Sequence, residues 1–242
     1  MVTNSKFWDR NKKQIQSDFL CRPYVISLLG NVKKKKILDA GCGEGYISRI
    51  LSEKKAIVVG IDISKKLIKI AKQKEDSLKL GASFYYSDIR NMKIIKNESQ
   101  DIVISVLVFN HLSKKTDWLK ALSEIKRVLK KKGVFILSLP HPFEMFYRPK
   151  TNWVRYLNGK IGNYWKEERI KKELYKSSKE TFIVNNYSKR FSTLINLLIE
   201  SGFMVDKILE PMPTKKDLST YPRLWGEEKK FPFYLIIRCL KK

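Results

Sequence analysis

The stretch that decides the fold is Ile37-Leu38-Asp39-Ala40-Gly41-Cys42-Gly43-Glu44-Gly45. It begins as a short apolar strand and ends in three glycines that alternate with other residues, ahead of a segment with helical spacing. A glycine-rich turn between a strand and a helix lets a ligand approach the backbone and presents free amides at a helix N-terminus. The stretch therefore predicts a cofactor site at the carboxyl end of a parallel strand.

The spacing of the glycines separates two classes of cofactor site. Dinucleotide binders need the pattern Gly-x-Gly-x-x-Gly, in which the pyrophosphate is seated on the helix N-terminus. This chain has Gly41-x-Gly43-x-Gly45, which is one residue short. The carboxylate of Asp39, at the end of the strand, would repel a pyrophosphate but attract a cofactor that carries an ammonium and a sulfonium. The stretch therefore favours a cationic cofactor.

Two more carboxylates follow the next two predicted strands. Asp62 ends the second strand, 17 residues past Gly45, and Asp88 lies near the end of the third. A carboxylate at the first position can accept hydrogen bonds from both hydroxyls of a ribose, and one at the second can accept from an adenine amino group. Because the carboxyl ends of parallel strands meet at one edge of a sheet, Asp39, Asp62 and Asp88 predict a single crevice.

Apolar strands alternate with amphipathic helices over the first 140 residues, which predicts an α/β fold with a Rossmann-like, doubly wound and mostly parallel sheet. A helix at 191–201 and strands at 203–209 and 233–240 follow later, and we expect these strands to pair as an antiparallel ribbon at one sheet edge. The other predicted strands are 36–39, 56–61, 83–86, 101–108 and 134–139, and the other predicted helices are 11–29 with a break at Pro23, 45–54, one capped by Ser64, and one that ends before Gly133.

The alternation stops between residues 142 and 187, where ten aromatic residues lie in a polar, broken stretch. We interpret this stretch as an insertion that forms a lid and an acceptor pocket, because an aromatic lid excludes water and stacks a planar or apolar acceptor. A satellite hydrophobic cluster that holds the insertion to the sheet is the alternative. The predicted organisation is an N-terminal helical cap (1–30), a cofactor-binding core (31–141), the lid (142–187) and the C-terminal part of the core sheet (188–242).

With these motifs in place, residues 35–140 resemble the class I S-adenosylmethionine-dependent methyltransferases, in the branch of the quinone-biosynthesis and small-molecule enzymes. The matching motifs are Asp39-x-Gly41-x-Gly43-x-Gly45, Gly60-Ile61-Asp62-Ile63-Ser64, Ser87-Asp88-Ile89, Asp101-Ile102-Val103-Ile104-Ser105, and Arg127-Val128-Leu129 leading to Gly133.

This resemblance implies S-adenosyl-L-methionine as cofactor, S-adenosyl-L-homocysteine as product, and no metal. It also implies that the region of Gly41 holds the methionine amino group, that Asp62 holds the ribose, and that Asp88 and the backbone of Ile89 bind the adenine. The candidate cofactor-binding residues are therefore Asp39, Gly41, Gly43, Gly45, Asp62, Ile63, Asp88, Ile89 and Ser105.

Several of these residues also have a purely structural interpretation. Asp39 could cap the following turn, Asp62 could cap the helix at Ser64, and Asp88 could close an Asx-turn. Cys42 lies within the glycine turn, and we expect it to act as a small filler there rather than as a nucleophile.

Methyl transfer is an in-line displacement from a sulfonium carbon, so the enzyme mainly aligns and desolvates the acceptor. An acceptor with a proton to lose can need a base. His111 and His141 follow the fourth and fifth strands and are the catalytic candidates, because histidine titrates near neutral pH. His111 could instead seat the next helix or stack on the cofactor, and His141 could contact the substrate. The candidate substrate-binding residues are the aromatic side chains Phe7, Trp8, Tyr24, Phe143, Tyr147, Trp153 and Tyr187.

Composition excludes several other classes of protein. The 242 residues are 43% hydrophobic, which is enough for a sizeable core. Three scattered cysteines argue against a disulfide framework or a zinc ribbon, and two histidines against a histidine-rich metal site. No apolar run reaches the ~18 residues that a membrane span needs, and the N-terminus lacks a signal-peptide core. We expect a cytoplasmic monomer or homodimer.

The net charge of +26 is the feature that bears on partners. Of the 50 basic residues 39 are lysine, and they are spread over the whole chain, so compositional bias is favoured over a polyanionic partner. Nucleic acid remains possible but not favoured. The predicted function is methyl transfer to an O or N atom of a small-molecule acceptor.

Three other functions stay open at this point. Residues 104–113 are similar to wobble-uridine tRNA methyltransferases, but Asn110-His111 replaces the paired histidines of that group. A non-catalytic, cofactor-binding partner subunit is disfavoured by the intact motifs. A dinucleotide oxidoreductase is disfavoured by the glycine spacing.

Overall fold

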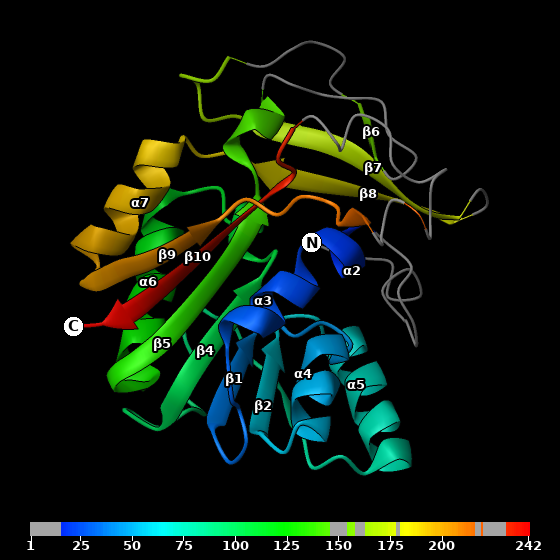
Figure 1. The fold of residues 1–242 in the computed structure, drawn as a ribbon, viewed down its shortest axis with the longest axis vertical. Helices are drawn as coiled ribbons and strands as arrows, with labels where there is room; N and C mark the ends of the chain where they lie inside the picture. Colours follow the sequence, from blue (N-terminus) through cyan, green and yellow to red (C-terminus); the bar gives the residue numbers. More distant parts are fainter. Residues whose placement is uncertain (1–15, 146–153, 158–162, 178–179, 216–218, 220–230) are drawn as a thin grey trace.

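The structure is a computed structural model that describes residues 16–145, 154–157, 163–177, 180–215, 219 and 231–242. Four predicted substrate-binding residues, Phe7, Trp8, Tyr147 and Trp153, lie outside the described residues. Figure 1 shows the arrangement of the elements. In chain order they are α2 (Ser17–Leu20), α3 (Arg22–Leu28), β1 (Lys36–Ala40), α4 (Tyr46–Glu53), β2 (Ile57–Asp62), α5 (Lys65–Leu78), β3 (Ser83–Tyr86), β4 (Gln100–Val106), η1 (Phe109–His111), α6 (Lys115–Val128), β5 (Leu129–Pro140), η2 (Pro142–Met145), β6 (Val154–Tyr156), β7 (Arg169–Ser177), β8 (Glu180–Tyr187), α7 (Phe191–Glu200), β9 (Phe203–Leu209) and β10 (Tyr234–Lys241).

Seven strands form one sheet in the order β3-β2-β1-β4-β5-β10-β9. The first five are parallel to their neighbours, whereas β10 runs antiparallel to both β5 and β9. The order in which strands are added reverses between β1 and β4, because β2 and β3 extend the sheet on one side of β1 and β4 and β5 extend it on the other. The expected doubly wound, mostly parallel sheet and its antiparallel ribbon at one edge are confirmed.

The central strands β1, β4 and β5 are buried on both faces of the sheet, because their alternate side chains enter different cores. In β1, Ile37 packs with α3, α4 and α5, and Leu38 packs on the opposite face with α6 and α7. In β5, Ile136 belongs to the first core and Phe135 and Leu137 to the second. The two helical layers are visible on either side of the sheet in Figure 1.

The aromatic stretch is more regular than its sequence suggested. We expected a broken insertion over residues 142–187, but β6, β7 and β8 form a separate, three-stranded antiparallel sheet. This second sheet lies beyond the end of the large sheet where the parallel strands finish (Figure 1), and β8 contacts η1 there. Strand β5 is also longer than predicted, since it begins at Leu129.

Local sequence explains where the elements next to the site begin. Ser64 accepts a hydrogen bond from the amide of Leu67, so it caps α5 as predicted. Gly45 precedes α4 with a φ of 81°, a backbone conformation that glycine adopts without steric cost.

The short 3-10 helix η1, which follows β4, packs against the buried side chain of Trp118. The indole Nε1 of Trp118 donates to the carbonyl of Leu112 over 3.1 Å. Its ring packs edge-on against Phe109, with 4.9 Å between ring centroids. Trp118 therefore contacts residues on both sides of His111.

We expect Trp118→Ala to lower the free energy of unfolding by about 3–5 kcal/mol, because it leaves a large cavity and unpairs the Leu112 carbonyl. Leu119→Ala, on the exposed neighbouring position, should change it by less than about 0.5 kcal/mol. Urea denaturation of both variants tests this. Equal losses would show that Trp118 has no special part in supporting η1.

Candidate active site

The glycine turn is folded against the end of β2. The amides of Gly41 and Cys42 donate to the carbonyl of Ile61, at 2.8 and 2.9 Å. The amide of Gly43 donates to the carboxylate of Asp62 at 2.9 Å. These bonds bring the ends of β1 and β2 together, so the turn and the two strands form one unit.

Gly41 lies where no other residue fits. Its φ is +88°, and a Cβ built on it would overlap with a methyl group of Val108. Gly43 also has a positive φ of +58°, but a Cβ there would meet nothing within 4 Å, so this position faces open space. The backbone at Gly43 is therefore accessible to a ligand, as the sequence predicted for such a turn.

Asp39 is a buried carboxylate whose residue is 2% exposed. Its Oδ2 accepts from the hydroxyl of Ser48 at 2.7 Å. Burial raises the pKa of Asp39 to about 6, and the nearby charge of Asp62 adds to this rise, whereas the Ser48 bond opposes it. A carboxylate held in this way would be stabilised by a cationic ligand group.

The position of Asp62 is compatible with both interpretations of this residue, ribose binding and capping near Ser64. Its Oδ1 accepts from the amide of Ser64 at 2.8 Å, and its Oδ2 from the amide of Gly43. Burial raises its pKa, although both backbone bonds oppose that shift. The side chain therefore anchors the turn and still faces the cavity described below.

Asp88 is held differently. Its Oδ1 accepts from the amide of Arg90 at 2.9 Å, which is the Asx-turn considered from the sequence, and its two oxygens also bind the guanidinium. Burial alone would raise the pKa of Asp88, but the hydrogen bonds and charge of Arg90 outweigh it and lower the pKa. Arg90 also forms an ion pair with Asp117 at 3.1 Å.

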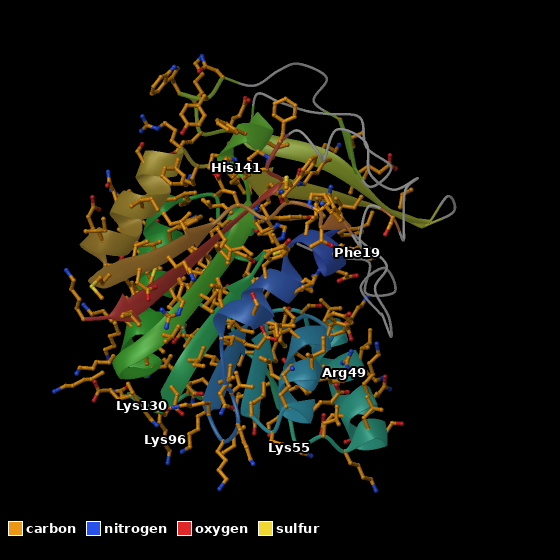
Figure 2. The ribbon with its side chains drawn as sticks, viewed as in Figure 1. Phe19, Arg49, Lys55, Lys96, Lys130 and His141 are labelled. Carbon is orange, nitrogen blue, oxygen red and sulfur yellow. The ribbon has the colours of Figure 1, made fainter. Side chains whose placement is uncertain are left out.

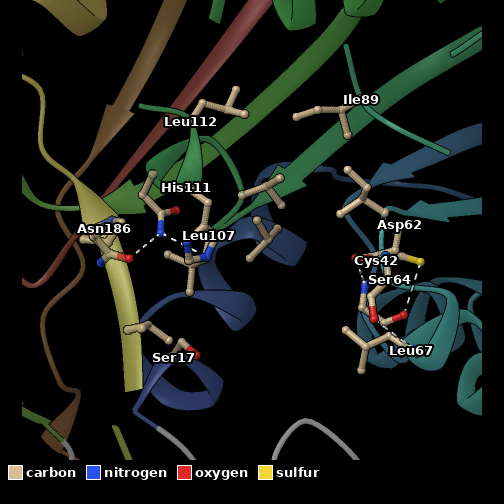
Figure 3. Close-up of a pocket in the computed structure, with 18 of the residues that line it drawn as sticks. Ser17, Cys42, Asp62, Ser64, Leu67, Ile89, Leu107, His111, Leu112 and Asn186 are labelled. Atoms are coloured by element: carbon tan, nitrogen blue, oxygen red, sulfur yellow. Dashed lines mark hydrogen bonds between the residues drawn. The ribbon is translucent and has the colours of Figure 1, made fainter. Parts of the chain in front are cut away.

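One cavity of about 720 Å³ connects these groups with η1 and the second sheet. Its size lies within the range of small-molecule and cofactor sites, roughly 300–1,000 Å³. Figure 3 shows Cys42, Asp62 and Ser64 on one side and His111 and Asn186 on the other. The predicted residues that line it are Asp39, Gly41, Gly43, Asp62, Ile63, Asp88, Ile89, His111 and Tyr187.

Other predicted site residues do not line this cavity. Ser105 is fully buried, and its hydroxyl donates to the carbonyl of Ala40 at 3.0 Å. Gly45 is the residue that directly precedes α4. Tyr24, on α3, donates its hydroxyl to the carbonyl of Met212 at 2.7 Å.

The two histidines have different positions. His141 is buried beside a small separate hollow, where its Nε2 meets Glu210 Oε1 at 2.8 Å and its ring packs on Phe143. It does not line the main cavity, so the structure gives no support to its expected role in catalysis or substrate contact. His111 does line the cavity, and its Nδ1 lies 3.0 Å from the carbonyl oxygen of Asn185.

His111 is an exposed residue that lines the cavity, and its ring is in contact with Asn110 and with the carbonyl of Asn185. Desolvation by the neighbouring protein lowers the pKa of His111 below its ordinary value. The hydrogen bond to the Asn185 carbonyl opposes this shift, and the charge of Lys172 adds to it. The ring is therefore neutral at pH 7. Burial raises the pKa of the Cys42 thiol well above its usual value, which argues against Cys42 as a nucleophile.

Sequence reasoning missed most of the other polar residues around the cavity, and four of them lie near His111 or Asp88. Lys172 and Asn186, on β7 and β8, are buried and face the cavity, together with Asn110 of η1 and Arg90 after β3. The signal for Asn186 was present in the alternation Phe182, Val184, Asn186 along β8, but a polar residue at an inward position hides a strand.

Residues 31–193 match the family described as "Methyltransferase domain". The chain belongs to this methyltransferase family. An uncharacterized protein of Haemophilus influenzae is 27% identical over 86% of this chain and 85% of its own length. The ubiquinone biosynthesis O-methyltransferase of Haemophilus ducreyi is 31% identical, but over only 48% of this chain and 49% of that enzyme.

Solved structures agree on the fold. An S-adenosylmethionine-dependent methyltransferase from Mesorhizobium loti superimposes with a TM-score of 0.71 at 23% identity, covering 90% of this chain and 96% of that one. One from Aquifex aeolicus superimposes with a TM-score of 0.64 at 16% identity, covering 98% of each chain. This methyltransferase thus has the Rossmann-like fold of the class I S-adenosylmethionine-dependent enzymes.

Two further observations concern the described residues only. None of the helices in this part of the chain is long and apolar enough to cross a membrane. Within the same residues, no group of three or more His, Cys, Asp or Glu side chains is arranged to hold a metal ion.

We expect the affinity of this methyltransferase for S-adenosylhomocysteine to fall as the pH drops below about 6, the pKa of Asp39. Protonated Asp39 must lose its proton before it can pair with the ammonium of the ligand, so the loss approaches about tenfold per pH unit. Titration calorimetry between pH 5 and pH 8 measures it.

Asp39→Asn is the matched control, because it keeps the size of the side chain and removes the charge. This variant should bind weakly at every pH and lose most of the pH dependence. A wild-type affinity that stays constant from pH 8 to pH 5 would show that Asp39 does not contact the ammonium.

Proposed function

We propose that this methyltransferase moves a methyl group from S-adenosylmethionine to an O or N atom of a small-molecule acceptor. The observation that supports this is the division of the cavity into two ends. One end contains the glycine turn and the carboxylates of Asp39 and Asp62. The other contains His111 and β8 (Figure 3), which contributes the aromatic side chains of Phe182 and Tyr187 to the lining.

The carboxylate end fits a cationic cofactor. Asp39 is a buried carboxylate with a raised pKa, and the turn leaves open space at Gly43. We assign the ligand ammonium to Asp39 and the turn, and the ribose hydroxyls to Asp62. When bound, S-adenosylmethionine supplies a methyl group on a positively charged sulfur, which leaves as a neutral thioether.

The carboxylate of Asp88 is less available to the adenine than the sequence suggested. Asp88 already accepts hydrogen bonds from the backbone and the guanidinium of Arg90, so its carboxylate has little remaining capacity. Arg90 lines the same part of the cavity. We therefore assign the adenine to Ile89 and to Asp88 and Arg90 acting together.

The acceptor end can orient and desolvate a small molecule. Phe182 is buried and Tyr187 is half-buried, and both come from β8 of the second sheet. Side chains of this kind stack a planar or apolar group and exclude water. Neutral His111 can take a proton from a hydroxyl or an amine of the acceptor as the methyl group arrives.

The basic charge does not concentrate at the cavity. Lys55, Lys96 and Lys130 lie near the opposite end of the sheet from His141, as Figure 2 shows. An RNA acceptor would have to reach the carboxyl edge of the sheet, where five acidic and five basic side chains line the cavity and leave no excess of positive charge for a phosphate backbone. The charge distribution therefore supports a small-molecule acceptor over a tRNA.

Transfer of labelled methyl from S-adenosylmethionine into a cell extract tests the proposal. The extract is separated into RNA and small-molecule fractions after incubation with wild-type protein or the Asp62→Ala variant. We expect wild-type label in the small-molecule fraction. Wild-type label confined to RNA would contradict the acceptor class, and no label above that of the variant would contradict catalysis by this site.

Asp62→Ala should weaken S-adenosylhomocysteine binding by roughly 2–3 kcal/mol, because hydrogen bonds to a charged group are lost. Asp101→Ala is a control from the other end of the sheet, where Asp101 accepts from the amide of Lys36 and pairs with Lys130. It should leave the affinity unchanged in calorimetry. Equal affinities for the wild type and Asp62→Ala would disprove the ribose assignment.

A further inference from the structure

His111 is held by the main chain of the second sheet. Its Nδ1 lies 3.0 Å from the carbonyl oxygen of Asn185, on β8. A carbonyl oxygen only accepts hydrogen bonds, so Nδ1 must carry the proton. In a neutral imidazole this leaves the lone pair on Nε2, where the side-chain amide of Asn110 is the neighbouring donor.

A second contact fixes β8 against η1. The Nδ2 of Asn110 donates to Oδ1 of Asn186 at 2.9 Å, and these side chains are 6% and 3% exposed. The same Nδ2 lies 3.4 Å from Nε2 of His111. Figure 3 shows Asn186 and His111 on the same side of the cavity, connected by these bonds.

The Asn110–Asn186 and His111–Asn185 contacts both join η1 to β8. Asn110 and His111 are consecutive in η1, and Asn185 and Asn186 are consecutive in β8. Successive side chains of a strand point to opposite faces, so Asn186 faces inward while the side chain of Asn185 is exposed. The inward side chain thus keeps the neighbouring carbonyl within reach of the imidazole.

We propose that Asn186 is a positioning residue that, through Asn110, holds the Asn185 carbonyl against His111 and so fixes the Nδ1-protonated tautomer. The second sheet is then part of the catalytic arrangement as well as a cover. Without the Asn110–Asn186 and His111–Asn185 hydrogen bonds, the neutral imidazole would exchange between its two tautomers. Only one of them presents the lone pair of Nε2 while Nδ1 remains anchored.

The use of this lone pair rests on the proposed function. The acceptor replaces the long contact between Nδ2 of Asn110 and Nε2, and as its oxygen or nitrogen gains the methyl group, its proton moves to Nε2 and His111 becomes an imidazolium. The positive charge lost from the sulfur then resides on the imidazole, where the Asn185 carbonyl stabilises it through Nδ1. The proton leaves to water when the product departs.

His141 provides an internal reference with the opposite arrangement. Its Nδ1 accepts from the amide of Phe143 at 3.1 Å, and its Nε2 faces Glu210. An amide nitrogen only donates, so His141 carries its proton on Nε2. Because the chain has only two histidines, the two patterns can be separated in one spectrum.

Long-range ¹H–¹⁵N NMR of the imidazoles, at neutral pH and without cofactor or acceptor, tests the proposal. His111→Gln assigns the signals. In the wild type we expect a single Nδ1-protonated pattern for His111 and an Nε2-protonated pattern for His141. Asn186→Ala should shift His111 to averaged nitrogen signals, and Asn185→Ala should not, since the Asn185 carbonyl belongs to the main chain.

The signals of His141 report whether Asn186→Ala is folded. If that variant loses them, Asn186→Asp replaces it, because its carboxylate can still accept from Asn110 and should keep the wild-type pattern at His111. An Nδ1-protonated His111 that persists in folded Asn186→Ala would overturn the proposal, as would averaged signals in Asn186→Asp. Since no cofactor is used, failure here leaves the proposed methyl transfer to be judged by binding and label transfer.

Discussion

Gly41 and Cys42 donate their amides to the carbonyl of Ile61, and Gly43 donates to the carboxylate of Asp62. These hydrogen bonds fold the turn after β1 against the end of β2. They set the distance between Asp39 and Asp62, and they leave the backbone at Gly43 facing the cavity. The rest of the site depends on this constraint, because a turn that moved away from β2 would separate the carboxylates and close the open space.

The constraint has an energetic cost that a ligand can relieve. Two buried carboxylates with raised pKa values lie close together, and their mutual repulsion and desolvation oppose ionisation. A cationic group placed between them would offset both effects. The carboxylate end of the cavity therefore suits a positive charge, whereas the opposite end, with neutral His111 and aromatic side chains, suits an uncharged reacting group.

The sequence predicted the parts of the site that depend on strand ends. Asp39, Asp62 and Asp88 follow buried strands, so their meeting at one edge of the sheet follows from topology alone. The second sheet was missed because Lys172 and Asn186 occupy inward positions that an ordinary strand fills with apolar residues. The pairing of His141 with Glu210 joins residues 69 positions apart, and no local pattern indicates such a contact.

The central claim is that the carboxylate end of the cavity binds S-adenosylmethionine. Equilibrium dialysis of the purified chain with labelled S-adenosylmethionine at pH 7.5 tests it most directly, with unlabelled S-adenosylhomocysteine or NAD as competitor. The account predicts saturable binding of one molecule per chain, displaced by S-adenosylhomocysteine and unaffected by NAD. Absence of saturable binding, or displacement by NAD at similar concentrations, would contradict it.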